Sequence, residues 1–286
     1  MACTNPIGIS DKLGNATKRP CGACIDCRLD HSRQWAIRCY HEAQMYDENS
    51  FLTLTYNDDN LPKDGSISKK ELQNFMKRLR QKIEPVQVRF FGCGEYGEKY
   101  DRPHYHLCLF GYDFPDKEIH STNFRRKSDP DILYISEMLS EVWKKGFHTI
   151  GEVNLKTAGY AARYITKKHM GKLSNYVYDG LEPEFALMSR GQKKGGKGGI
   201  GKPWFDKYWM DCYPKDFVTI NGKKHKPPKY YDALIERKNK KMWQHIKAKR
   251  ELHSFLKEPE SDMRLVEKDN YRKQLVKRLE RTFENA

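Results

Sequence analysis

The stretch "DRPHYHLCLFG" at residues 101–111 decides the fold of this chain, because it places two histidines one residue apart inside an apolar run. Successive side chains of a β-strand point to opposite faces of its sheet. A strand here divides the stretch into one face with His104, His106, Cys108 and Phe110 and another with Tyr105, Leu107 and Leu109. The sequence therefore predicts two imidazoles side by side on one sheet face.

Predicted strands and helices alternate around this strand. We expect strands at 51–56, 86–95, 104–112 and 147–154, and helices at 29–46, 66–83, 131–146 and 157–169. Ser68 followed by Glu71 fits a capping box at the start of one helix. The order of strand, helix, two strands, helix and strand predicts an α+β fold with a ferredoxin-like or RRM-like core. Such a core is an antiparallel sheet with helices on one face, and we expect the other face to be free to bind.

The chain of 286 residues is strongly basic, with 53 Lys and Arg against 38 Asp and Glu and a formal net charge of +15. This excess indicates nucleic acid as the partner, ahead of an anionic membrane surface. Residues 187–229 hold eleven Lys and Arg against three Asp, and six glycines fall at 191–201. There is no apolar run of about 18 residues and no signal-peptide pattern, so we expect a cytoplasmic protein without a membrane span.

Composition shifts along the chain predict four segments. They are a Cys-rich segment with a helix at 1–48, the sheet-forming core at 49–185, a Gly/Lys/aromatic extension at 186–235 and a charged helical tail at 236–286. The stretch "GKGGIGK" in the third segment matches a phosphate-binding P-loop until Pro203 replaces the Ser or Thr that would bind Mg²⁺. We therefore expect no ATPase. Trp204 and the aromatic residues after it can stack on bases or form a small core.

A carboxylate completes a candidate metal site. Glu95 ends the strand before the histidine pair, and a hairpin would bring it beside both rings. Two imidazoles and one carboxylate suit a divalent ion that keeps open positions for substrate, and they are compatible with Mg²⁺, Mn²⁺ or Zn²⁺. The alternative is an incidental pair on a solvated face, but an apolar strand disfavours it.

A second pattern lies in "YAARYITKK". Tyr160, Tyr164 and Lys168 are spaced by four and would share one face of a helix. They are either a packed aromatic stripe or a set of nucleophiles with a nearby ammonium. A phenol has a pKa of about 10 and needs activation before it attacks phosphorus.

Four cysteines form a third pattern. Cys21, Cys24 and Cys27 have knuckle spacing, and Cys3 brings the thiolates to four, which suits structural zinc. An iron–sulfur cluster and unligated reduced thiols are the alternatives.

Three motifs in order resemble those of the HUH rolling-circle replication initiators. They are "FLTLTY" (51–56), "GEYGEKYDRPHYHLCLFG" (94–111) and the tyrosine helix just described. More narrowly, "CGACIDCRLDHSRQWAIRCYHE" (21–42) and "GIGKPWFDKYWMDCYP" (199–214) resemble the replication initiator of gokushoviruses, single-stranded DNA phages of the microvirus group.

This resemblance implies a metal-dependent DNA nickase and strand transferase acting in the host bacterial cytoplasm. The family's metal ligands fall on His104, His106 and Glu95 with Mg²⁺ or Mn²⁺, and its nucleophiles fall on Tyr160 and Tyr164. Such an enzyme keeps a 5′ phosphate on tyrosine and relies on a host polymerase and helicase.

Residues for contacts with DNA follow from the charge and aromatic patterns. Lys168 would steady phosphate charge, and Lys167 is its substitute. Further candidates for contacting DNA are Arg190, Lys193, Lys194, Lys197, Lys202 and Trp204.

The competing functions are a relaxase or transposase of the same chemistry, a hydrolase that uses metal-activated water, and a non-enzymatic zinc module that coats or packages single-stranded DNA. Each predicts a different product from the same DNA.

Overall fold

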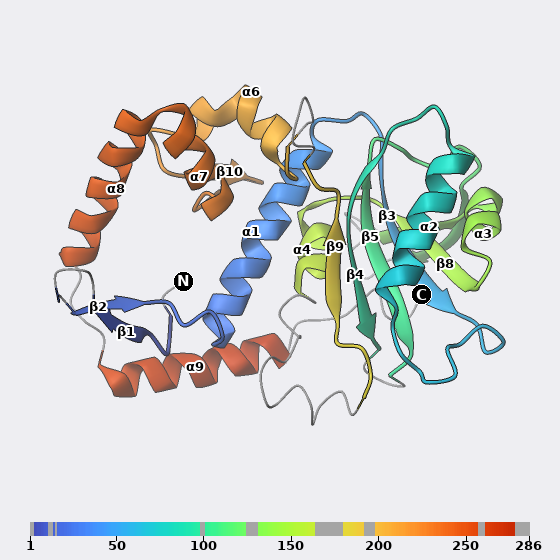
Figure 1. The fold of residues 1–286 in the computed structure, drawn as a ribbon, viewed down its shortest axis with the longest axis horizontal. Coiled ribbons are helices and arrows are strands. Elements are labelled where there is room, and N and C mark those ends of the chain that lie inside the picture. The colour runs from blue at the N-terminus through green and yellow to red at the C-terminus, as the bar shows by residue number, and fades with distance from the viewer. Residues whose placement is uncertain are drawn as a thin grey trace. The chain divides into compact units, whose positions relative to one another are not determined.

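The computed structural model describes residues 3–10, 14, 16–97, 101–123, 131–163, 180–191, 198–256 and 261–277. The chain divides into two compact units (Figure 1). Unit 1 is Met1–Gln34 with Phe205–Thr282, and unit 2 is Trp35–Trp204 with Phe283–Ala286. No helix in the described ranges is both long and apolar enough to cross a membrane.

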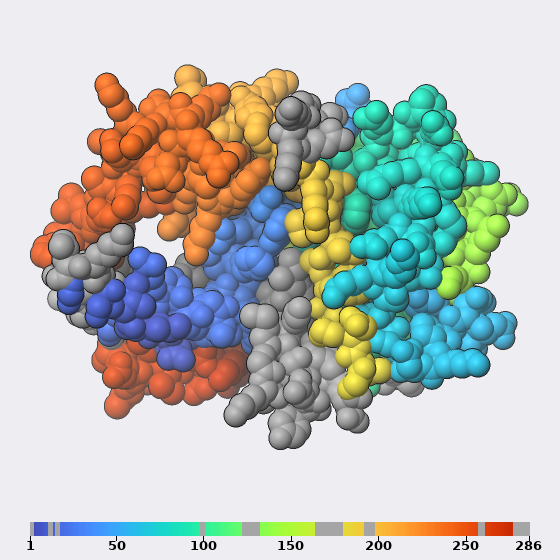
Figure 2. Space-filling model, viewed as in Figure 1, coloured from blue at the N-terminus to red at the C-terminus, as the bar shows by residue number. Residues whose placement is uncertain are grey.

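Unit 2 is built on a seven-stranded antiparallel sheet. Its strands are β3 (Asn49–Tyr56), β4 (Arg89–Tyr96), β5 (Pro103–Phe110), β6 (Glu118–Asn123), β7 (Asp131–Ile135), β8 (Gly146–Gly151) and β9 (Phe185–Met188). They lie in the order β6-β7-β8-β3-β5-β4-β9. The four central strands are the four that sequence patterning predicts, so the α+β fold class with a ferredoxin-like core is confirmed. Figure 2 shows the yellow residues around the edge strand β9 as an exposed band along unit 2.

Two helices cover the first face of this sheet. They are α2 (Lys69–Lys82) and α3 (Glu137–Trp143). Ser68 caps α2 as expected, because its hydroxyl accepts a hydrogen bond from the Glu71 N–H at 3.3 Å. The core beneath includes Leu72, Phe75, Trp143, Tyr105, Leu107 and Leu109. The second set of side chains in the histidine strand therefore faces this core, as alternation predicts.

The second sheet face is also covered, so the expectation that it is free was wrong. The later half of α1 (Ile25–Ala43) and α4 (Leu155–Arg163) pack on it. This face carries buried apolar side chains, among them Phe51 and Phe91, which water would disfavour. Trp35 of α1 stacks on Phe91 with ring centroids 5.0 Å apart, and the small residues Ala158 and Ala161 of α4 belong to the same buried cluster.

Residues 131–146 do not form the single helix that patterning predicts. Asp131–Ile135 is β7, and the helix α3 begins after Ser136, whose hydroxyl accepts a hydrogen bond from the Leu139 N–H at 3.1 Å. Pairing of β7 with β6 supplies the partner that sequence analysis lacked, since β6 lies in a stretch interpreted as a polar connection. Sheet pairing therefore outweighs local helix propensity here.

Unit 1 combines two hairpins with helices. The hairpins are β1 (Ile7–Ser10) with β2 (Ala16–Arg19) and β10 (Val218–Ile220) with β11 (Lys223–His225). The helices are the first part of α1, most of α6 (Lys202–Cys212), α7 (Lys229–Lys238), α8 (Lys240–Phe255) and α9 (Asp262–Lys277). The helical, basic extension expected at the C-terminal side is present.

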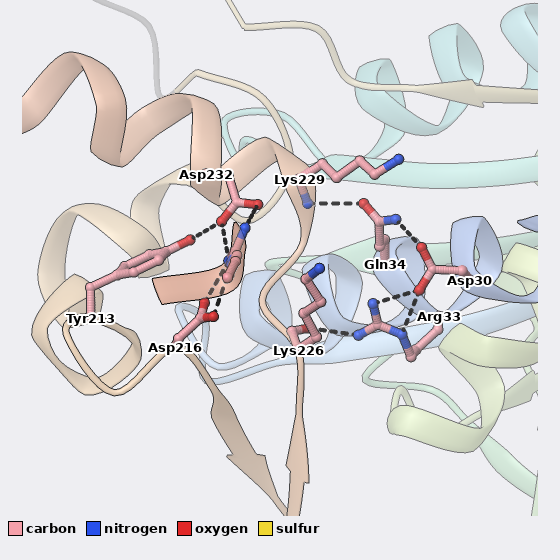
Figure 3. Close-up of polar contacts among 9 residues, drawn as sticks. Asp30, Arg33, Gln34, Tyr213, Asp216, Lys226, Lys229 and Asp232 are labelled. Atoms are coloured by element: carbon pink, nitrogen blue, oxygen red, sulfur yellow. Dashed lines mark hydrogen bonds and ion pairs between the residues drawn. The ribbon is translucent and has the colours of Figure 1, made fainter. Parts of the chain in front are cut away.

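Polar contacts hold the parts of unit 1 together (Figure 3). Arg33 Nη1 donates to the Lys226 carbonyl at 2.6 Å, which ties α1 to the segment before α7. Arg250 of α8 donates to both Asp216 and Asp232, with 2.8 Å separating its Nε from Asp216 Oδ2. Tyr213 also donates to Asp232, at 2.7 Å. One guanidinium thus joins α7, α8 and the turn after α6.

Candidate metal and nucleophile site

The β4–β5 hairpin brings the three predicted metal ligands together. Glu95 lies directly opposite His104 in the antiparallel register. Its Oε1 is 2.6 Å from His104 Nε2 and 2.9 Å from His106 Nε2. The exposed fractions are 0% for Glu95, 6% for His104 and 0% for His106. The pair is therefore a buried cluster with a carboxylate and not an incidental pair on a solvated face.

The far nitrogens of both rings have their own partners. His104 Nδ1 lies 3.0 Å from the carbonyl oxygen of Arg102. A carbonyl only accepts hydrogen bonds, so this nitrogen carries the proton when the ring is neutral, and Nε2 presents the lone pair. Thr53 Oγ1 lies 3.0 Å from His106 Nδ1 and orients the second ring. Such outer partners fix the orientation of histidines that bind metals.

The electrostatics of the cluster favour an ionised carboxylate. Burial by itself raises the pKa of Glu95, but the charges and hydrogen bonds of His104 and His106 outweigh it and hold the pKa below its ordinary value. A negative charge enclosed between two imidazoles is the local charge that a divalent cation neutralises.

These residues fit a divalent metal ion. Glu95, His104 and His106 each offer one ligand atom, and the three atoms lie within 4.8 Å of one another. One oxygen and two nitrogens match the donor preferences of Mn²⁺ and Zn²⁺ and admit Mg²⁺. Three protein ligands leave further coordination positions for substrate.

Tyr160 is the predicted nucleophile that the structure describes, and it contacts the cluster. Its ring meets the His106 ring edge-on, with centroids 4.9 Å apart and an interplanar angle of 88°. Its exposed fraction is 1%, and the Arg163 guanidinium lies 5.5 Å from its ring centroid. The first part of the predicted tyrosine helix is therefore folded as α4 against the histidine strand.

A cap at the start of α4 positions this tyrosine. Asn154 Oδ1 accepts a hydrogen bond from the Thr157 N–H at 3.0 Å, and Thr157 Oγ1 accepts one from the Asn154 N–H at 2.9 Å. Reciprocal bonds of this kind fix where a helix begins. Tyr160 follows within the first turns and is directed by them.

Several predicted site residues lie outside the described residues. They are the second candidate nucleophile and five candidate phosphate contacts, namely Tyr164, Lys167, Lys168, Lys193, Lys194 and Lys197. Their roles stay predictions.

Arg190, Lys202 and Trp204 are described away from the metal cluster. Arg190 is exposed and Lys202 begins α6. Trp204 is 8% exposed, and its ring stacks on His41 with centroids 3.6 Å apart. This contact is part of a packed core, the alternative interpretation of the aromatic segment.

The described end of the glycine-rich stretch is anchored in unit 2. The Gly201 N–H donates to the buried carboxylate of Glu42 at 2.6 Å, and Arg89 pairs with that carboxylate at 2.8 Å. Arg89 also donates to the Gly198 carbonyl at 2.7 Å. A carboxylate takes the place that a nucleotide phosphate occupies in a P-loop, which agrees with the interpretation that this stretch is not an ATPase motif.

The four predicted thiols of unit 1 also converge. Cys3 Sγ lies 3.6 Å from Cys21 Sγ and 3.7 Å from Cys24 Sγ, and all four sulfurs lie within 4.8 Å of one another. All four cysteines are half-buried and none forms a disulfide. The cluster is a second candidate metal-binding group.

Neighbouring groups make these thiols unequal. Burial raises the pKa of Cys24, but hydrogen bonds from Thr4 and Cys27 outweigh it and lower this pKa to about 6. Burial and the neighbouring Cys24 and Cys3 raise the pKa of Cys27 to about 12. A thiolate at Cys24 beside protonated neighbours is typical of a cluster that shares few negative charges.

Two positioning residues escaped sequence reasoning. Thr53 lies in the predicted strand "FLTLTY", and aligning that strand with His106 would have found it, since the two residues are direct partners. Arg102 acts through its backbone carbonyl, which leaves no signal in residue type.

The fold and the site define an α+β protein with a candidate divalent-metal centre on its antiparallel sheet. A family model described as replication-associated protein ORF2 matches residues 49–169. The replication-associated protein VP4 of Bdellovibrio phage phiMH2K is 32% identical over 244 residues, which cover 82% of this chain and 73% of that protein. The replication-associated protein ORF2 of Spiroplasma virus 4 is 35% identical over 250 residues, covering 81% of this chain and 72% of that protein.

A further relative is the replication-associated protein ORF4 of Chlamydia phage 1, 29% identical over 221 residues, or 76% of this chain and 53% of that protein. No solved structure matches the chain. The chain belongs to the replication-associated proteins of microvirus-type phages, which confirms the resemblance found in its motifs.

Proposed function

We propose that this protein is an HUH tyrosine endonuclease that nicks single-stranded DNA at a phage origin and rejoins the strands in rolling-circle replication. The observation that carries the proposal is the contact between the buried Glu95, His104 and His106 cluster and the ring of Tyr160. Membership of a phage replication family supports it.

The proposed reaction is a transfer of one phosphodiester bond. The Tyr160 oxygen bonds to the phosphorus and loses its proton, while the 3′ oxygen of the preceding nucleotide leaves and takes up a proton. The products are a 5′ phosphotyrosine and a free 3′ hydroxyl, and rejoining is the reverse transfer.

Glu95, His104 and His106 would hold Mg²⁺ or Mn²⁺, which when bound supplies Lewis-acid polarisation of the scissile phosphate. Thr53 and the Arg102 carbonyl keep both rings turned toward Glu95, so the ligand atoms are in place before substrate arrives. Tyr160 is 1% exposed without DNA. Local opening around α4 on DNA binding is therefore part of the proposal.

A second nucleophile makes the reaction cyclic. Tyr164 is proposed to cut the regenerated origin while Tyr160 is still esterified, and Lys168 or Lys167 to steady phosphate charge. Arg190, Lys193, Lys194, Lys197, Lys202 and Trp204 remain proposed DNA contacts. A host helicase and polymerase in the bacterial cytoplasm would separate and extend the strands.

For the four cysteines we propose structural zinc. Four sulfurs within 4.8 Å of one another suit a closed tetrahedral site. Such a site would stabilise the start of α1 in unit 1.

The test is a covalent adduct. Purified protein is mixed with labelled single-stranded origin DNA and Mn²⁺, and a denaturing gel is examined for label that migrates with protein. Wild type is compared with Tyr160→Phe, Tyr164→Phe, the double variant and His106→Ala. We expect a metal-dependent adduct that the double variant and His106→Ala lose. Tyr112→Phe is the matched control, because that phenol donates to Met138 on the other side of the sheet.

Two results would contradict the proposal. Free 5′ phosphates without an adduct would indicate a hydrolase, and DNA binding unchanged in every variant without any cleavage would indicate a coating or packaging protein.

A further inference from the structure

A hollow of about 620 Å³ opens in unit 2 where β7 and β8 separate. The two strands pair at Tyr134 and Ile150, and toward Gly146 the start of α3 and the β6 strand form the opposite wall. This volume accommodates a few side chains of a ligand. The hollow lies away from the strands that carry the metal cluster, and nothing in the proposed reaction uses it.

The walls of the hollow are held by hydrogen bonds. Asp116 accepts from the Ser136 hydroxyl at 2.7 Å and from the Met138 N–H at 2.9 Å. His148 Nε2 accepts from the Ser136 N–H at 3.1 Å. The loop before β6, the start of α3 and β8 are therefore joined at Ser136, and the hollow exists without a ligand.

The lining is acidic although the chain is basic. Asp116, Glu118 and Glu137 line it, and no Lys or Arg does. Within the described ranges these three carboxylates form no ion pair, whereas nearby lysines have carboxylates of their own, Lys117 with Asp113 and Lys145 with Glu71. The hollow thus presents negative charge that the protein does not neutralise, and it repels DNA.

The same hollow exposes apolar surface. Phe147 is 65% exposed and Ile135 is 37% exposed, and both belong to its lining. A large aromatic ring in water beside unneutralised carboxylates combines the two features of a protein-binding site, an apolar anchor and charges that orient the partner.

We propose that this hollow binds a cationic segment of a partner protein, in which Lys or Arg side chains reach Glu118 and Glu137 while an apolar side chain covers Phe147. Charge complementarity selects this occupant. The +15 chain attracts polyanions over most of its surface, so an acidic hollow attracts a different class of partner from the one that its basic residues attract. The protein would hold DNA and a basic partner at separate places.

The test uses fluorescence anisotropy of a labelled peptide of alternating arginine and leucine, titrated with full-length protein free of DNA. The paired variant Glu118→Lys with Glu137→Lys reverses the charge of the hollow. Its matched control is Glu236→Lys with Glu267→Lys, which makes the same charge change at exposed positions of α7 and α9. We expect the hollow variant to weaken binding about tenfold or more and the control to change it by less than about twofold.

Phe147→Ala tests the apolar part without altering charge, and we expect about fivefold weaker binding. A peptide with glutamate in place of arginine should not bind. DNA nicking should be the same in all these variants, which separates this proposal from the proposed function.

Two results would overturn the proposal. Equal weakening by the hollow variant and its control would show general charge attraction and no site. Concentration-dependent dimers that sediment in wild type and disappear in the hollow variant would show that a second copy of this chain is the occupant.

Discussion

Replacing Thr53 with valine is expected to weaken the metal site although no metal ligand changes. Thr53 Oγ1 lies 3.0 Å from His106 Nδ1, and the two side chains are 5% and 0% exposed. Valine is similar in size and is at least as favourable in a β-strand. The substitution therefore removes one hydroxyl and leaves the register of β3 with β5 in place.

The magnitude follows from the burial of His106. Water cannot readily replace the lost hydroxyl beside a fully buried ring, so we expect a loss of stability of about 1–3 kcal/mol. Removing an outer hydrogen bond from a metal-binding histidine lowers metal affinity about 10–100-fold. Nicking at limiting metal should fall accordingly and recover when the metal concentration is raised.

Calorimetric titration with Mn²⁺ measures the affinity, and Thr55→Val is the matched control. Thr55 lies two residues along the same strand, opposite His104, and within the described ranges its hydroxyl makes no hydrogen bond. We expect the control to bind Mn²⁺ as wild type does. Equal affinities for wild type and Thr53→Val, or equal weakening by both variants, would refute the reasoning that Thr53 orients His106.

Three further predictions concern stability and zinc. Arg89→Met should lower the free energy of unfolding by about 3–5 kcal/mol, because the fully buried carboxylate of Glu42 loses its cation; urea unfolding that matches wild type would contradict this account. Arg250→Leu should cost about 2 kcal/mol in the same assay, since it removes the guanidinium that joins Asp216 to its neighbours in a partly exposed site; an unchanged midpoint would show that the network adds nothing. Protein purified with zinc should hold about one equivalent at the cysteine cluster, as measured by atomic emission, and Cys24→Ser should lose it and unfold at a lower temperature; full zinc content in that variant would rule out this set of ligands.

Local patterns were sufficient for the central sheet and for the metal ligands. Strict alternation in residues 104–110 places imidazoles and aliphatic side chains on opposite faces whatever the neighbours are, because successive side chains of a strand point in opposite directions. Glu95 precedes His104 by a connection short enough for a hairpin, which limits where its carboxylate can lie. Ser68 marks the start of α2 because its hydroxyl satisfies an N–H of the first turn.

Contacts between distant segments decided the rest. The strand character of 131–135 depends on pairing with β6, which no short window of sequence contains. The covering of the second sheet face depends on how α1 and α4 pack, and so does the contact of Tyr160 with His106. Thr53 became a positioning residue through register alone. Sequence by itself determined which side chains share a face, since backbone geometry repeats along the chain, whereas only the tertiary structure decided which faces meet, because that depends on burial and pairing summed over the whole unit.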